Sequence, residues 1–172
     1  MDRSARIYFI LLAGTLLWCA LIVLAPICRA SGSPALKSVG DLLYALFGPI
    51  CHQIDARSFH VLGAPLAVCS RCSSVYFGFL FGVLLYPLVF GPGRYVQRGR
   101  WVLALALAPM LVDVFVDVLG VHESTMFTRA ITGGWFGLLA PLSIVPAAVR
   151  GLEEIFARPS PFIQPEKGQQ DA

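Results

Sequence analysis

Four long apolar stretches constrain the fold of this chain more than any other feature of its sequence. They cover residues 7–24, 73–90, 101–119 and 131–149. A helix needs about 20 mostly apolar residues to cross a hydrocarbon core of about 30 Å, and each stretch is close to that length. Only 13% of the residues are charged, whereas soluble domains average about 25%. The sequence therefore predicts an all-α integral membrane bundle of four transmembrane helices.

The polar segments divide the chain into a membrane domain and a tail. Residues 1–157 form one predicted transmembrane domain, and residues 158–172, rich in Pro, Gln and Gly, are predicted to be a disordered polar tail. Residues 40–50 are apolar but too short to cross the bilayer, which predicts a short interfacial or re-entrant helix between the first two spans. The first span exceeds the apolar core of about 7–15 residues found in signal peptides, so we expect an uncleaved anchor.

The distribution of Lys and Arg predicts an orientation. With four spans, eight of the 13 basic residues lie on the side of both termini, and five lie on the side of residues 28–72. Because basic loops stay in the cytoplasm, we expect a multi-pass protein of the cell (inner) membrane with both termini cytoplasmic. The formal charge of +3, without a basic stripe, does not indicate a nucleic-acid partner.

Four residues of the segment 28–72 have the chemistry of a metal site. Cys69 and Cys72 have C-x-x-C spacing, which lets two thiolates reach one ion, and Cys51 and His52 offer two more ligands. Three Cys and one His complete a tetrahedral site of the kind that zinc favours. Adjacent Cys51 and His52 converge on one ion less easily, so His52 could instead face a substrate.

The same cysteines fit other chemistry. A C-x-x-C pair at a helix start beside Arg71 favours a thiolate, as in a thiol–disulfide oxidoreductase with Cys51 as resolving partner. A structural disulfide between two of the cysteines, or a set of inert thiols, is also consistent with this spacing. Cys19, inside the first span, is interpreted as a small buried apolar residue.

A longer set of residues continues this pattern along the chain. It consists of Cys51-His52-Gln53, Arg57-Ser58-Phe59, Cys69-x-Arg71-Cys72, Tyr76-x-Gly78, Pro109, Asp113, Gly120, Glu123-Ser124, Arg129 and Thr132-Gly133. In these residues the chain resembles a family of small predicted membrane proteins from bacteria and archaea, a domain of unknown function. The resemblance covers residues 42–137 and implies that the cysteines form one site, without implying an activity. The family often has Asp-Gly-x-x-Gln where this chain continues from Asp113 to Asp117, so a role for that Gln is not expected here.

Asp113 and Asp117 lie in the third span, four residues apart on one helix face. An aspartate near mid-membrane costs about 2.5–3.5 kcal/mol on insertion scales, so each should have a partner or a function. The predicted topology brings both toward the cysteine side, with three arginines as counter-ions or as an anion site: Arg57, Arg71 and Arg129. A structural Asp–Arg network is one interpretation. A proton relay, a cation site or a catalytic carboxylate pair is the other.

The loop before the fourth span adds polar groups on the same side. His122 and Glu123 are further catalytic candidates, and Ser124 or Thr125 is expected to cap the next helix. Arginines beside hydroxyl and imidazole groups suit a phosphate or another anionic headgroup, which suggests a lipid or small-molecule substrate. Two G-x-x-x-G motifs, Gly78/Gly82 and Gly133/Gly137, predict close helix contacts within the bundle or in a homo-oligomer.

Together these patterns predict an integral membrane protein with an extracytoplasmic-face Cys/His metal site, with zinc as the expected ion, next to intramembrane carboxylates. No Walker loop, nucleophile elbow or H-E-x-x-H motif occurs, so no reaction is assigned. The competing hypotheses are a membrane thiol–disulfide oxidoreductase, a small transporter and a lipid-phosphate-binding membrane enzyme.

Overall fold

Helices make up most of the described chain, residues 3–91, 94–95, 100–121 and 123–157, in this computed structural model. The helices are α1 (Arg3–Ala30), α2 (Pro34–Phe47), α3 (Ser70–Phe90), α4 (Arg100–Val118), α5 (Met126–Leu139) and α6 (Pro141–Ala157), with a 3-10 turn η1 (Asp55–Arg57) and strands β1 (His60–Val61) and β2 (Ala64–Pro65). The predicted tail, residues 158–172, and His122 lie outside the described residues.

Four helical segments of the described chain are long and apolar enough to cross a membrane. They are Arg3–Ala30, Ser70–Phe90, Trp101–Val118 and Met126–Ile155. The prediction of an all-α bundle with four spanning segments is therefore confirmed. The fourth segment is two helices, α5 and α6, which meet at Ala140. Pro141 begins α6, and because proline has no backbone N–H it disfavours one uninterrupted helix through this point.

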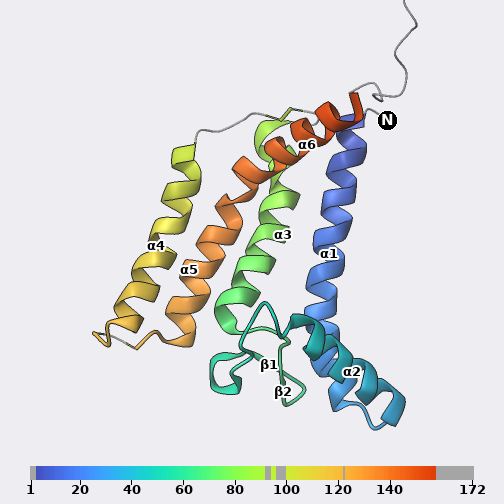
Figure 1. Cartoon of the computed structure of the whole chain (residues 1–172), viewed down its shortest axis with the longest axis vertical. Helices are drawn as coiled ribbons and strands as arrows, with labels where there is room; N and C mark the ends of the chain where they lie inside the picture. The colour runs from blue at the N-terminus through green and yellow to red at the C-terminus, as the bar shows by residue number, and fades with distance from the viewer. Residues whose placement is uncertain (1–2, 92–93, 96–99, 122, 158–172) are drawn as a thin grey trace, which may run out of the picture.

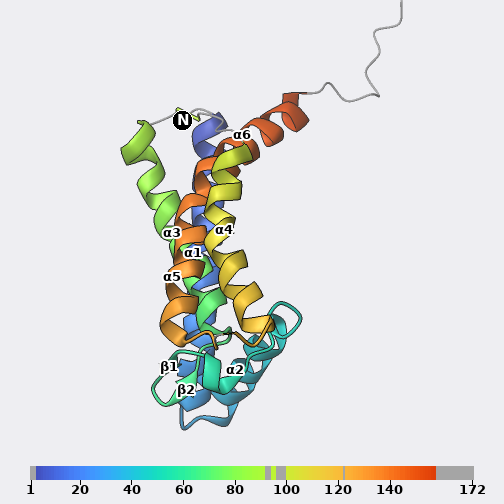
Figure 2. The same cartoon turned by 90° about the vertical axis from the view of Figure 1, so that its left-hand side faces the viewer.

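The bundle places the two ends of each spanning helix at opposite faces (Figure 1). α3 contacts both α1 and α5, and α4 packs on α5. α6 continues from α5 and reaches the N-terminal half of α1. The described ends of the chain lie at one end of the bundle, the upper end in Figure 1. The other end holds α2, the β1–β2 hairpin, the start of α3 and the α4–α5 connection (Figure 2).

Glycines bring α3 and α5 unusually close. A methyl group on Gly78 would lie 2.7 Å from a backbone oxygen of α5, and one on Gly137 would lie 2.2 Å from a backbone oxygen of α3. The corresponding distances for Gly82 and Gly133 are 2.5 Å and 2.6 Å. Small residues let backbones approach in lipid, where packing drives helix association. Both predicted G-x-x-x-G motifs thus lie in the contact between α3 and the α5–α6 segment of the same chain, so their glycine faces are covered within the bundle.

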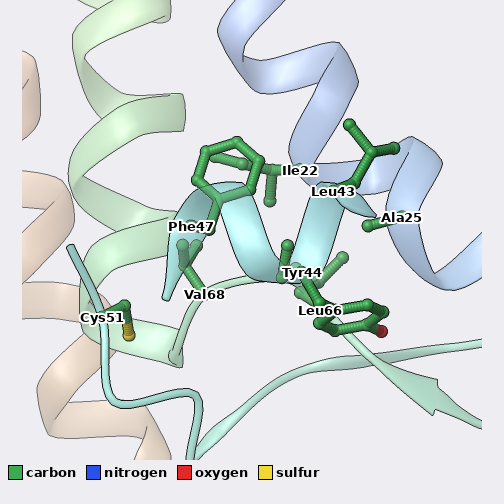
Figure 3. Close-up of a cluster of buried hydrophobic side chains, with 9 residues drawn as sticks. Ile22, Ala25, Leu43, Tyr44, Phe47, Cys51, Leu66 and Val68 are labelled. Carbon is green, nitrogen blue, oxygen red and sulfur yellow. The ribbon is translucent and has the colours of Figure 1, made fainter. Parts of the chain in front are cut away.

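α2 packs against the C-terminal part of α1 at the lower end of the bundle in Figure 1. Its residues Leu43, Tyr44 and Phe47 are buried with Ile22 and Ala25 of α1 (Figure 3). Four apolar residues of α2 are nevertheless exposed: Leu36, Val39, Leu42 and Leu46. A short helix is therefore present before the second span as predicted, but it begins at Pro34 and ends at Phe47, whereas the prediction covered residues 40–50.

A small hairpin leads from α2 toward α3. β1 and β2 pair antiparallel around the two-residue turn Leu62-Gly63, in which both residues have positive φ. Such a turn matches the twist of a tight hairpin. The hydroxyl of Tyr44 donates to the carbonyl of Pro65, which ties β2 to α2. These two short strands were not predicted from the sequence.

Candidate metal centre

Three cysteine sulfurs meet where α3 begins. Cys51 follows α2, Cys69 directly precedes the first turn of α3, and Cys72 lies in that turn. Their Sγ atoms all lie within 4.8 Å of one another. Cys51 is buried at the edge of the cluster that joins α1, α2 and the segment before α3 (Figure 3). All five cysteines of the chain are described, and none forms a disulfide.

Gln53 holds the loop that carries Cys51. Its side-chain Nε2 donates to the carbonyls of Tyr44, at 2.7 Å, and Ala67, at 2.8 Å. Its backbone has a φ of 50°, which a residue with a side chain rarely adopts. The two bonds connect α2 to the segment before Cys69, and the backbone N–H of Cys69 donates to Cys51 Sγ at 3.2 Å. This local scaffold brings sulfurs 18 positions apart into one group.

The surroundings of Cys69 favour its thiolate. Hydrogen bonding from the Cys72 thiol is the main cause, and the backbone N–H of Cys72, the Cys51 thiol and the backbone N–H of Arg71 add to it. Burial acts in the opposite direction, but the net effect lowers the pKa of Cys69 from 9.0 to about 5. A thiolate at neutral pH is the form that binds metals and attacks electrophiles.

A cavity of about 340 Å³, called here the thiol cavity, opens beside the three sulfurs. Besides the cysteines, its lining includes His52 and the three predicted arginines: Arg57, Arg71 and Arg129. His52 is exposed, and its ring nitrogens are not part of the sulfur group. The structure thus brings together three of the four predicted ligands and leaves His52 at the cavity wall.

Two ion pairs connect the cavity arginines to α4. Arg71 pairs with Asp113, and Arg129 Nη2 lies 3.0 Å from Asp117 Oδ2. Arg129 is 5% exposed, so its charge lies in a poorly hydrated region where an ion pair is most needed. Both aspartates therefore have arginine partners, as the predicted structural Asp–Arg network requires, and neither lines the thiol cavity.

Ser124 joins the two ion pairs. Its hydroxyl donates to Asp113 Oδ1 at 2.9 Å, and its backbone N–H donates to Asp117 Oδ1 at 2.9 Å. Its carbonyl accepts from Arg129 Nε at 3.1 Å. The neighbouring Thr125, not Ser124, caps α5 by accepting from the backbone N–H three residues later.

The remaining candidates and two missed residues complete the comparison with the sequence. Glu123 is exposed, and His122 lies outside the described residues. Gln53 was noted only as part of a pattern, and Ser124 only as part of that pattern and as a possible helix cap, although each makes several of the bonds that build the site. The only signal in the sequence was position: Gln53 directly follows the Cys-His pair, and Ser124 directly precedes the helix cap. Position alone does not tell which groups these side chains bind.

The sulfur group fits a tetrahedral metal with modest adjustment. Bonds of about 2.3 Å to zinc place tetrahedral sulfurs about 3.8 Å apart, compared with the 4.8 Å limit of the group. Side-chain rotation of half-buried Cys69 and Cys72 can supply that contraction. Donor type and spacing therefore allow a metal site with three thiolate ligands, with a fourth position left for another ligand.

Fold and site together define a multi-pass membrane protein with a three-thiol cluster at one end of its bundle. The family model for predicted membrane proteins of the DUF2085 type matches residues 51–152, and the chain belongs to that family. The match begins at Cys51 and contains the whole cluster, so the resemblance seen in the sequence is confirmed.

Relatives of this chain occur in archaea. An uncharacterized protein of Methanocaldococcus jannaschii is 35% identical over 143 residues, which is 82% of this chain and 92% of that protein. An uncharacterized protein of Methanothermobacter thermautotrophicus is 33% identical over 87 residues, which is 51% of this chain and 77% of that protein. No solved structure matches the chain.

Proposed function

We propose that this protein binds a metal ion, zinc, through Cys51, Cys69 and Cys72 at the extracytoplasmic face of the cell membrane. The observation that carries the proposal is the approach of three sulfurs to within 4.8 Å of one another. Thiolates select zinc over magnesium or calcium, and three of them leave one tetrahedral position for His52 or for a small ligand. The intramembrane pair Asp113 and Asp117 acts on the site through the arginines that they hold.

Metal analysis of the full chain tests this proposal. We expect roughly one zinc per chain after anaerobic purification in detergent, as in other closed or three-ligand sites. Cys51→Ser and Cys69→Ser should lose the metal. Cys28→Ser is the matched control, because Cys28 is equally buried but lies at the end of α1 outside the group.

A thiol count on the same sample separates the outcomes. Metal-free protein with all thiols titratable, or with two of them oxidised, would contradict the proposal. His52→Ala decides the fourth position, since loss of metal would make His52 a ligand and retained metal would leave that position to another group.

The proposed orientation is tested separately. Lys and Arg distribution supports cytoplasmic termini, with the thiol cavity outside. Gly32→Cys, in a background without the native cysteines, puts a thiol in the α1–α2 connection, where an added side chain meets no atom within 4 Å. A membrane-impermeant maleimide should label it in intact cells. Labelling only after the cells are broken would reverse the orientation.

A thiol–disulfide oxidoreductase is the second candidate, and the lowered pKa of Cys69 favours it. The Cys69 thiolate would attack a substrate disulfide and release one substrate thiolate, which takes up a proton. The Cys51 thiol, the predicted resolving partner, would then lose its proton and attack the Cys69 sulfur of the mixed disulfide, releasing the second substrate thiol and leaving Cys51–Cys69 oxidised. Cys51→Ala should trap the mixed disulfide in cells, and its absence together with bound metal would reject this candidate.

A further inference from the structure

Two hollows lie in succession along the same pair of helices. One is the thiol cavity. The other is a groove of about 550 Å³ between α1, α3 and the α5–α6 segment, called here the apolar groove. Its lining includes Gly14, Thr15, Trp18, Tyr76 and Phe136, and none of its lining residues is charged.

Helical register places the two hollows end to end. Cys72 lines the thiol cavity, and Tyr76, one turn later on α3, lines the apolar groove. On α5, Arg129 lines the cavity, and Phe136, two turns later, lines the groove. At 1.5 Å per residue these pairs are about 6 Å and about 10 Å apart along their helices. An elongated molecule with one end in the thiol cavity therefore has the apolar groove about 6–10 Å away along the two helices.

The thiol cavity has cationic groups available for an anion. Arg71 and Arg129 are paired with aspartates, whereas Arg57 forms no ion pair with any carboxylate of the described residues. Arg71 lines the cavity as well, and its hydrogen bonds to Asp113 and Ser124 both come from Nη2. Arginine is well suited to phosphate because its planar donors match the phosphate oxygens.

We infer that the thiol cavity and the apolar groove together bind one phosphate-bearing lipid, with the anionic headgroup against the arginines and one acyl chain in the groove. A free phosphate would use only the first hollow, and a neutral apolar molecule only the second. A phosphate-bearing lipid accounts for both hollows because it joins an anionic headgroup to a hydrocarbon chain. The inference goes beyond the proposed function, since it depends on the arginines and the groove and not on the thiols.

Native mass spectrometry of the full chain in detergent tests the inference. Dioleoyl phosphatidic acid is the probe, and dioleoyl phosphatidylcholine is the zwitterionic comparison. We expect one tightly bound phosphatidic acid per chain and much weaker binding of phosphatidylcholine. Arg57→Gln should weaken phosphatidic acid binding roughly tenfold, the value of one charge-assisted hydrogen bond.

Variants of the groove test the acyl-chain half. Gly14→Leu places a side chain in the groove that Gly14 lines, and its Cβ would meet no atom within 4 Å. It should also weaken binding roughly tenfold, the value of about 1.4 kcal/mol. Gly151→Leu is the matched control, since Gly151 is an equally open helical glycine that does not line the groove, and it should bind normally. Where Gly14→Leu does not fold, Thr15→Leu narrows the same groove and must show the same weakening.

Three results would overturn the inference. The first is equal binding of phosphatidylcholine and phosphatidic acid. The second is full displacement of phosphatidic acid by glycerol 3-phosphate with no effect of Gly14→Leu, which would indicate a site for free phosphate. The third is unchanged binding in Arg57→Gln. Cys69→Ser separates this inference from the metal proposal, because that variant should lose metal and still bind lipid.

Discussion

Removal of the positive charge of Arg129 should destabilise the protein far more than removal of both partners of its ion pair. Arg129 Nη2 lies 3.0 Å from Asp117 Oδ2, and the two side chains are 6% and 21% exposed. Arg129→Gln leaves the aspartate charge without its partner between α4 and α5. Arg129→Gln with Asp117→Asn leaves two neutral groups, which can still form hydrogen bonds.

The geometry sets the size of the effect. Charges about 4 Å apart at an effective dielectric constant of about 20 attract by about 4 kcal/mol. Breaking a buried pair from one side costs about 3–5 kcal/mol, because the remaining charge is uncompensated, whereas neutral replacement of both partners costs much less. For a chain of this length, about 3–5 kcal/mol corresponds to a fall in Tm of roughly 6–20 °C.

Thermal unfolding in detergent, followed by tryptophan fluorescence, measures this difference. We expect a large fall in Tm for Arg129→Gln and recovery of at least half of it in the double variant. Equal Tm values for wild type and Arg129→Gln would show that the charge is not held by this pair. Additive losses in the double variant would show that the two residues do not stabilise each other, and the proposed role of Asp117 would be wrong.

Three further predictions concern packing, protonation and the loop of the site. Gly137→Ala should lower Tm, because its methyl group would lie 2.2 Å from a backbone oxygen of α3, whereas Gly151→Ala should leave Tm unchanged or raise it. Alkylation of Cys69 in metal-free protein should stay fast from pH 8 to pH 6 and slow only near pH 5, because its thiolate persists down to its lowered pKa of about 5. Peptide mass spectrometry at each pH checks this, and alkylation that already slows between pH 9 and pH 7 would contradict it. Gln53→Met should cost about 2 kcal/mol, the value of two hydrogen bonds, and should reduce bound metal, which unfolding and metal analysis measure together; full metal content would show that Cys51 does not need this support.

The spans and the cysteine group were predictable because they depend on the length of apolar runs and on the spacing of the cysteines, which can be read from the sequence. A run of about 20 apolar residues has few stable alternatives to a membrane helix. Cys69 and Cys72 are neighbours in any helical first turn, and only Cys51 had to be brought from elsewhere. The family pattern, with Cys51 and the C-x-x-C pair in one set, supplied that link.

The sequence left the position of His52 open between a ligand and a residue facing a substrate, and it did not predict the support from Gln53. Adjacent side chains such as Cys51 and His52 commonly point in different directions, and the loop conformation decides which one faces the sulfurs. That conformation depends on a positive φ at Gln53 and on two carbonyls from separate segments. The contact between α3 and α5 through their glycines was also not predictable, because the G-x-x-x-G motif occurs in helix contacts both within one chain and between chains.

Arg71 explains why the thiol cluster and the membrane aspartates occur in one protein. It lies between Cys69 and Cys72, its guanidinium pairs with Asp113 of α4, and its carbonyl lies against Gly133 of α5. The turn that presents two sulfurs is therefore held from both α4 and α5. An aspartate in a span is costly, but here the same ion pair that offsets the cost also fixes the arginine at the cavity wall. Asp113 therefore contributes by positioning Arg71, and neutralising it should disturb the cavity even if no proton ever moves through the span.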